Sequence, residues 1–260
     1  MPNFLYRLPN WLIMVIFVSL FIFIMDGLPR LLQLIPFFTP TPQTDQYARM
    51  VFGPVCASTG LIVGFLLRQG QGNLRYVENL VADEAGRINN LDRLLLRFGD
   101  NQALEIRNTL IQYVESTIDK EWVDLWAGKG SEETHMLWRN ISQKIFQLDP
   151  KSPKQLSIYS DIIEKSEEVS ESRESRIDKA TDRLSNIFWI VIALLVVSLA
   201  LINTLFFQSN ELIFANAIVP SALGGLVSLL VILDQPFKGE SSVRPKALSR
   251  VLDSILTRGK

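Results

Sequence analysis

The side chains best suited to bind a metal ion gather around His135. This residue is the only histidine of the chain and lies beside Glu132 and Glu133 in the segment SEETHMLWRN. A divalent metal site needs several ligands that converge on one point, and one imidazole with two flexible carboxylates is a weak start. The stretch therefore indicates a solvated turn of helix rather than a metal centre, and we expect no cofactor.

A second concentration of ionisable groups is the segment EKSEEVSESRESRIDKATDR, residues 164–183. Its acids could form a regulatory cation site, but they alternate with lysine and arginine at helical spacing. Such alternation is typical of an exposed helix crossed by ion pairs. Nothing in the sequence resembles a P-loop, a dinucleotide fingerprint or a nucleophile elbow. The residues therefore favour a protein that is not an enzyme.

The composition indicates a membrane protein. The chain has 260 residues, of which 48% are hydrophobic, and a formal net charge of −1. This nearly neutral balance, without a basic stripe, argues against a nucleic-acid partner. The single cysteine, Cys56, excludes an internal disulfide and a multi-cysteine metal site. A lipid bilayer is the expected partner of a chain with this apolar content.

Four segments are long and apolar enough to cross a bilayer, which takes about 20 helical residues. They are Trp11–Met25, Met50–Leu67, Ile187–Phe207 and Leu212–Leu233. The first is short unless Phe4–Asn10 extends it; a signal peptide is the alternative, although no small-residue cleavage site follows it. Only residues 208–211 separate the last two spans, which predicts a tight antiparallel turn. The sequence thus predicts an all-α integral membrane protein with four transmembrane helices in two hairpins.

Lysine and arginine residues near the spans predict the orientation. They follow the second span, precede the third and follow the fourth, and the turn between the last two spans has none. Both termini and the central region are therefore predicted to be cytoplasmic, at the inner membrane if the protein is bacterial. The expected organisation is a first transmembrane pair at residues 1–67, a large cytosolic helical region at 68–186, a second transmembrane pair at 187–233 and a cytosolic tail at 234–260.

The central region is helical by pattern. Apolar residues recur at helical spacing up to Gly99, which ends the first helix, and Asp100 is suited to cap the next, Asn101–Trp122. The dipeptides Asp149-Pro150 and Ser152-Pro153 are expected to interrupt the helical pattern again. No breaker separates Lys154 from the third span, so one long helix is predicted to run from cytosol into membrane. The tryptophans Trp122, Trp126 and Trp138 are expected in the core or at a subunit interface.

The last three spans contain no ionisable residue between their flanking charges. Proton relays and charged pores need such groups, so a proton-driven pump or a Lys/Arg-ringed anion pore is disfavoured. Two alternatives remain: a pore of apolar and small residues that is gated by dewetting, or faces that only pack against lipid and other helices. Aromatic ring edges and helix N-termini are electropositive, so an apolar pore can still favour an anion.

Two stretches of the sequence carry a family resemblance. Residues 64–95, GFLLRQGQGNLRYVENLVADEAGRINNLDRLL, resemble the second membrane helix of bestrophins and its continuation into the cytosol. Residues 233–240, LDQPFKGE, are similar to the Pro-Phe-Gly-acid turn after the last membrane helix of that family. The arrangement of spans is also similar, and the resemblance extends to bacterial proteins with a bestrophin-like domain. It implies a homo-oligomer, a pentamer, that conducts anions such as chloride passively.

The resemblance also implies a hydrophobic neck. Gly64 and Phe65 match the family's Gly-aromatic pair, so Phe65 would face the pore axis. Leu61 and Ala57 follow one and two turns earlier at helical spacing. Ala57 is smaller than the residue that the family usually has there, which leaves open whether the neck closes.

The turn after the last span consists of Asp234, Pro236, Phe237, Gly239 and Glu240. Animal bestrophins bind calcium through acids after this turn, whereas this chain has only Asp234 and Glu240, with Lys238 between them. The turn is therefore predicted to be structural, and no metal is expected. An aspartate at a helix C-terminus opposes the helix dipole. Asp234 is therefore expected to have a partner, such as Arg68 or Arg75.

Two other functions remain open. A stator-like proton-channel subunit shares the order of two spans, a large cytosolic loop and two spans, but it needs a partner that supplies an intramembrane acid. A non-conducting scaffold or signalling protein would instead use its cytosolic helices as the working part. The oligomer number, together with the presence of a continuous axial path, distinguishes both from a channel.

Overall fold

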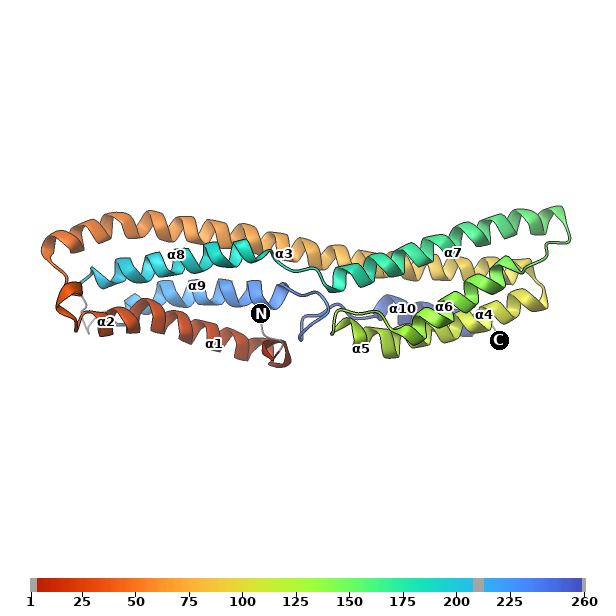
Figure 1. The fold of residues 1–260 in the computed structure, drawn as a ribbon, viewed down its shortest axis with the longest axis horizontal. Coiled ribbons are helices and arrows are strands. Elements are labelled where there is room, and N and C mark those ends of the chain that lie inside the picture. Colours follow the sequence, from red (N-terminus) through yellow and green to blue (C-terminus); the bar gives the residue numbers. More distant parts are fainter. Residues whose placement is uncertain (1–3, 208–212, 259–260) are drawn as a thin grey trace. The chain divides into compact units, whose positions relative to one another are not determined.

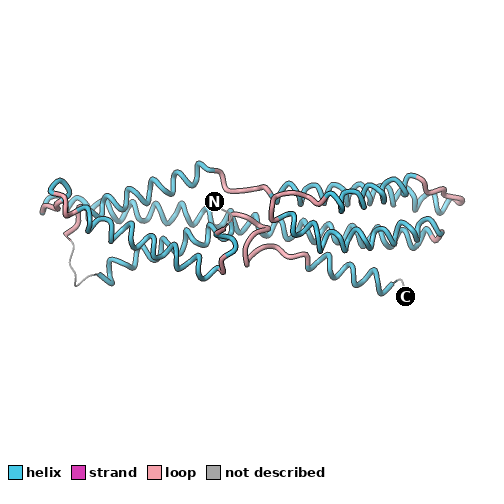
Figure 2. The backbone as a smooth tube through the Cα atoms, turned by 60° about the horizontal axis from the view of Figure 1, so that its bottom comes forward, coloured by secondary structure: helices cyan, strands magenta, loops and turns pink. Residues whose placement is uncertain are grey.

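The computed structural model describes residues 4–207 and 213–258, and every regular element within these ranges is a helix (Figure 2). Contacts divide the chain into two compact units. The first consists of residues up to Asn73 and of Arg183–Ser241, and the second of Leu74–Asp182 and the residues from Ser242 onward. Helix α3, Pro42–Phe98, contributes to both units.

The first unit is built around four long apolar helices (Figure 1). Side chains from all four share one core, with Phe21, Val63, Val196 and Val227 among its buried members. Its elements are η1 Leu5–Arg7, α1 Asn10–Ile22, the π-helical turn η2 Phe23–Gly27, α2 Leu28–Leu32, η3 Pro36–Phe38, the N-terminal part of α3, α8 Asn186–Thr204 and α9 Ile213–Leu233.

The four predicted spans are confirmed as helices of sufficient length and apolarity. The candidate spans are Asn10–Leu32, a window within Pro42–Phe98, Asn186–Thr204 and Asn216–Leu233. Helix α1 begins at Asn10 after Pro9, so of the predicted extension Phe4–Asn10 only Asn10 belongs to the span, which continues to Leu32 on its C-terminal side instead. This C-terminal continuation contains an ion pair, in which Arg30 Nε lies 3.0 Å from Asp26 Oδ2 one helical turn away. The predicted turn at residues 208–211 lies outside the described residues.

Helix α1 packs along α9, and Gly224 allows their close approach. A Cβ atom at this position would lie 2.9 Å from the backbone oxygen of Phe17 and 2.9 Å from Cα of Val18. Only glycine therefore fits where the two backbones meet. At the next position, Gly225, an added Cβ atom would meet nothing within 4 Å.

The second unit is a helical bundle with its own apolar core. The predicted end of α3 at Gly99 and the cap at Asp100 are confirmed, since Gly99 has φ 77° and Asp100 Oδ1 accepts a 2.7 Å hydrogen bond from the Ala103 amide. Trp138 is buried and its ring lies 5.0 Å from that of Tyr113, which confirms a core role. The other elements are α4 Asn101–Ser116, the π-helical turn η4 Thr117–Glu121, α5 Trp122–Leu125, α6 Glu132–Phe146, α7 Pro153–Ala180 and α10 Lys246–Arg258.

The predicted long helix from Lys154 into the third span is wrong. Helix α7 ends at Ala180 and α8 begins at Asn186. Side-chain bonds close the end of α7: the Thr181 hydroxyl donates to the Asp178 carbonyl at 2.9 Å. The link between α7 and α8 is bound by a residue of another segment, because the Leu184 amide donates to Asp234 Oδ1 at 2.8 Å. Residues 181–185 contain no glycine or proline, so the sequence does not indicate that the helix ends here.

Candidate pore segment and post-span turn

The apolar part of α3 has two different sides. Thr59 and Val63 are buried in the first unit, whereas Leu61 and Phe65 are 75% and 65% exposed, and Ala57 is exposed as well. Positions four residues apart lie on the same side of a helix. The three residues of the predicted neck therefore lie together on the side of α3 that faces away from the core of the chain.

The two hydroxyl groups of the span, Ser58 on the exposed side and Thr59 on the buried side, are both bonded within the helix. The Ser58 hydroxyl donates to the Pro54 carbonyl at 2.9 Å, and the Thr59 hydroxyl donates to the Val55 carbonyl at 2.8 Å. Both groups are thus satisfied within their own helix, as polar groups in a bilayer must be. An ion beside this segment would meet an apolar surface.

Three glycines of the same span face open space among the described residues. A Cβ atom added at Gly53, Gly60 or Gly64 would meet nothing within 4 Å. In a membrane, small residues allow close contact between neighbouring helices. These glycines therefore leave room for another helix or for lipid on this part of α3.

Asp234 is buried at the end of α9 and has two partners. Its Oδ1 accepts the Leu184 amide at 2.8 Å, and its Oδ2 accepts the Tyr6 hydroxyl at 3.4 Å. A partner was correctly predicted, but its identity as Arg68 or Arg75 was wrong. Three segments that are distant in sequence meet at this carboxylate, namely the N-terminal segment, the link before α8 and the end of α9.

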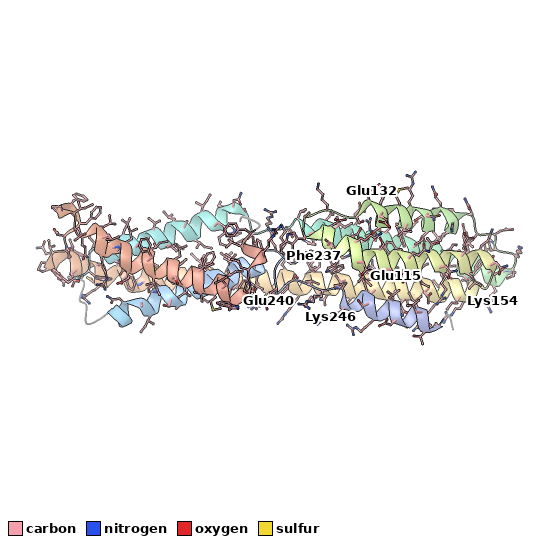
Figure 3. The ribbon with its side chains drawn as sticks, turned by 90° about the horizontal axis from the view of Figure 1, so that it is seen from below. Glu115, Glu132, Lys154, Phe237, Glu240 and Lys246 are labelled. Carbon is pink, nitrogen blue, oxygen red and sulfur yellow. The ribbon has the colours of Figure 1, made fainter. Side chains whose placement is uncertain are left out.

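The rest of the turn holds the start of α1 (Figure 3). Phe237 is buried, as is Pro236, and Gly239 adopts φ 83°, a left-handed conformation that favours glycine. Glu240 accepts the Asn10 amide at 3.0 Å. A carboxylate at a helix N-terminus satisfies an unpaired amide and complements the helix dipole.

Burial shifts the pKa values of three groups in and beside this turn. Burial raises the pKa of Asp234 above its usual value, although hydrogen bonds from Leu184 and Tyr6 oppose the shift. Burial also raises the pKa of Tyr6, to which the charge of Asp234 adds. Burial lowers the pKa of Lys238, assisted by the charge of Arg183. Within the described residues, no group of three or more His, Cys, Asp or Glu side chains converges as metal ligands would.

A buried ion-pair network in the second unit was missed by sequence reasoning. Arg176 Nε donates to Glu84 Oε2 at 2.6 Å, and Arg176 Nη2 donates to Glu121 Oε1 at 2.7 Å. Arg173 also pairs with Glu121, and the Arg176 guanidinium lies 5.2 Å from the ring centre of Trp122. The prediction that residues 164–183 form an exposed helix crossed by ion pairs is therefore wrong for one side of α7, where Arg173 and Arg176 are buried.

One feature of the sequence could have indicated that these two arginines are buried. Arg173 and Arg176 lie at spacings of four and three between Val169 and Ala180, which are both buried. They thus occupy the core side of α7. Charge alternation alone does not show which charged residues face the core, since the acids that pair with these arginines belong to other helices.

The π-helical turn η4 delivers Glu121 to this network. A π turn inserts one extra residue and shifts the positions that follow it around the helix axis. Glu121, its last residue, is fully buried and also accepts the Ser131 amide at 3.1 Å. Burial would raise the pKa of Glu121, but Arg176 and Arg173 outweigh it and lower that pKa.

The stretch around His135 is solvated, as predicted. His135, Glu132 and Glu133 are all exposed on α6. Glu133 pairs with Lys120 of η4, with Lys120 Nζ 2.5 Å from Glu133 Oε1. The three side chains therefore lie on an ordinary charged surface of the second unit.

The helices described above define the class of this protein, an all-α protein with four candidate membrane spans. The sequence pattern of the Bestrophin-like domain matches residues 12–248. The chain therefore belongs to the Bestrophin-like family, as residues 64–95 and 233–240 predicted. No curated protein matches the chain at a significant level.

Solved structures show the same fold. A bacterial bestrophin homologue from Klebsiella pneumoniae aligns with a TM-score of 0.67 at 12% identity, over 95% of this chain and 97% of that chain. Another structure, described as a membrane protein without a stated organism, aligns with a TM-score of 0.70 at 13% identity, over 95% of this chain and 99% of that chain. Similarity at these identities establishes a shared fold.

Proposed function

We propose that the chain forms a homo-oligomer, a pentamer, that conducts anions such as chloride passively across a membrane. Membership of the Bestrophin-like family and the fold shared with a bestrophin homologue support a channel rather than an enzyme. In this proposal α3 lines the axis, and Ala57, Leu61 and Phe65 form a hydrophobic neck.

The observation that carries this proposal is the exposed apolar side of α3. Leu61 and Phe65 project away from the core, and Gly53 and Gly64 make no close contact within the chain. When copies of α3 surround an axis, such a side forms an apolar constriction that conducts or closes according to whether water fills it. A stator-like proton path would need a second protein to supply its acid, because α8 and α9 contain none.

The topology belongs to the same proposal. The second unit and both chain ends lie in the cytoplasm, at the inner membrane if the protein is bacterial, because basic residues gather on that side of the spans. The turn from Asp234 to Glu240 holds the cytoplasmic end of α1 against the end of α9 and acts as a structural element. No metal or cofactor is required for conduction.

The test is chloride flux through purified protein in lipid vesicles. Phe65→Ala widens the neck and lowers its barrier to water, so the flux is expected to rise severalfold. Phe23→Ala is the matched control, because Phe23 is also an exposed aromatic residue but lies on the first span. Absence of chloride flux in both the wild type and Phe65→Ala would contradict the proposal.

The oligomer number provides a second, independent measurement. A mass measurement of the purified protein in detergent is expected to give five copies without another polypeptide. A monomer, or an assembly that needs a second protein, would support the scaffold or stator-like alternatives instead.

A further inference from the structure

Helix α3 carries one unbroken stripe of exposed residues, which we name the α3 stripe. It runs from Met50 to Arg97 at spacings of three and four residues, and each of its positions is exposed. Up to Phe65 it is apolar and contains the proposed neck. From Arg68 onward it consists of four arginines, two asparagines, two glycines and one alanine, with no acid. The stripe therefore changes from apolar to cationic along a single helix.

Three of these arginines belong to the second unit and have no partner among the residues that the structure describes. Arg75, Arg93 and Arg97 form no ion pair or side-chain hydrogen bond with any described residue. Buried arginines of the same unit behave differently: Arg107 Nε, for example, lies 2.7 Å from Asp92 Oδ1. The packing of the chain thus does not account for the three charges on the stripe.

The acids near the stripe do not cancel its charge. Glu78 and Asp83 are exposed and border the stripe between Arg75 and Arg93, so two acids stand against its four arginines and the net charge stays positive. Uncharged positions separate Arg75 from the neighbouring pair Arg93 and Arg97 on the stripe. A surface with this net positive charge attracts anions near its arginines.

We propose that Arg75, Arg93 and Arg97 form an electropositive track that concentrates and selects small inorganic anions. This inference rests on the proposed function, in which α3 lines the conduction axis. The neck has no free polar donor, and only the ring edge of Phe65 offers an anion a positive partial charge there. The full charges that select the sign of the permeating ion are therefore those on the cationic part of the stripe.

The chemistry of arginine suits this role. A guanidinium group stays charged at every physiological pH and is more weakly hydrated than an ammonium group, so an anion can pair with it and leave again. Arg93 and Arg97 are four residues apart, which is about 6 Å along a helix. This spacing is less than the Debye length of about 8 Å at physiological salt, so their fields overlap, and symmetric copies add to them.

The test is the chloride-to-potassium permeability ratio of the full-length protein in phosphatidylcholine vesicles under a KCl gradient. In about 10 mM salt, where the Debye length is about 30 Å, the ratio of the variant Arg75→Gln/Arg93→Gln/Arg97→Gln is expected to fall at least about threefold below that of the wild type. The loss shrinks in about 1 M salt, where that length is about 3 Å. Arg68 is left unchanged, because it lies within one turn of Phe65.

The matched control is Arg139→Gln/Arg244→Gln/Arg250→Gln, which removes the same charge from exposed positions outside α3. It is expected to keep the wild-type ratio. Because all six arginines are exposed, both variants should fold, and the elution volume of each oligomer checks this. Replacing the track arginines with glutamate should shift the preference toward potassium.

The outcomes separate the two proposals. No ion flux in the wild type overturns the proposed function, and the track with it. A conducting wild type with an unchanged ratio in the track variant overturns the track alone, as does an equal change in the control. The same holds if the ratio changes only when the vesicles contain phosphatidylglycerol, because the arginines then bind lipid headgroups.

Discussion

Two buried carboxylates show how the neighbours of a residue decide its charge state. Glu121 meets two guanidinium groups, whose charges outweigh the effect of burial and lower its pKa. Asp234 is bound directly by a backbone amide and a phenol, which are neutral donors, so burial dominates and raises its pKa. The same type of group therefore stabilises the fold in opposite ranges of pH.

Glu121→Gln is expected to destabilise the second unit strongly. Removing one partner of a buried ion pair costs about 3–5 kcal/mol, because the other charges remain buried without compensation. The wild-type contribution is present above the usual glutamate pKa of 4.5 and is lost as pH falls through the lower folded value. Denaturant unfolding followed by tryptophan fluorescence measures the change. Glu164→Gln, at an exposed position, is the control, and equal losses in both variants would refute the role of the network.

Asp234→Asn tests the post-span turn. The folded state resists ionisation of Asp234, so the wild type is expected to lose stability as pH rises from the usual aspartate pKa of 3.8 through the raised folded value. The asparagine can still accept the Leu184 amide but has no charge to bury, so its stability should depend less on pH in this range. Melting temperatures between about pH 4 and 7 measure the difference. Parallel pH profiles, with Asp253→Asn as exposed control, would show that burial of the charge is unimportant.

The helices combine local regularity with a few positions that only one residue fits. The α1 and α9 backbones meet at Gly224, whereas the adjacent Gly225 faces open space. The π turn η4 similarly places two side chains, Thr117 and Glu121, inside the second unit. The spacing of apolar residues predicts that a segment is helical, whereas contacts at single positions determine which helices pack against it.

Gly224→Ala is expected to weaken the packing of α1 on α9. Overpacking of this kind typically costs about 1–3 kcal/mol, because the methyl group can be accommodated only if the backbones separate. Gly225→Ala should be neutral or stabilising, since alanine favours a helix by about 1 kcal/mol over glycine. Thermal unfolding of both variants in one detergent provides the measurement. A loss in Gly225→Ala as large as in Gly224→Ala would contradict the assigned contact.

At the scale of the whole molecule, the order of apolar and polar helices predicts a defined topology. Four candidate spans belong to the first unit, and the second unit is rich in charged residues. Because charged helices do not enter a bilayer, the second unit is expected to remain in water on one side. The distribution of lysine and arginine predicts that this side is the cytoplasmic one.

Labelling of single cysteines tests this topology. In a Cys56→Ser background, Ser254→Cys on α10 should react with a membrane-impermeant maleimide only after the cells are lysed. Thr41→Cys, between the first two spans, should react in intact cells. Both positions are exposed in the fold, so accessibility within the protein does not limit the reaction. Reaction of Ser254→Cys in intact cells would reverse the proposed orientation.

Features that depend on neighbouring residues could be predicted from the sequence. The spans follow from apolar length, the end of α3 from Gly99 and the start of α4 from Asp100, because these signals act within one or two helical turns. The shared side of Ala57, Leu61 and Phe65 follows from helical spacing in the same way. Their role as a pore neck stays a prediction, since it depends on other copies of the chain.

Only the tertiary structure decided which charges are buried and which segments meet. Arg176 and Glu84 are 92 positions apart, and Tyr6 and Asp234 are 228 positions apart. No local pattern encodes such pairs, so the acid-rich helix was predicted to be exposed and Asp234 was assigned the wrong partner. The break between α7 and α8 has the same cause, because part of the link is held by an aspartate from the end of α9. Burial and long-range hydrogen bonds arise only when distant segments pack, and the sequence of one segment cannot show them.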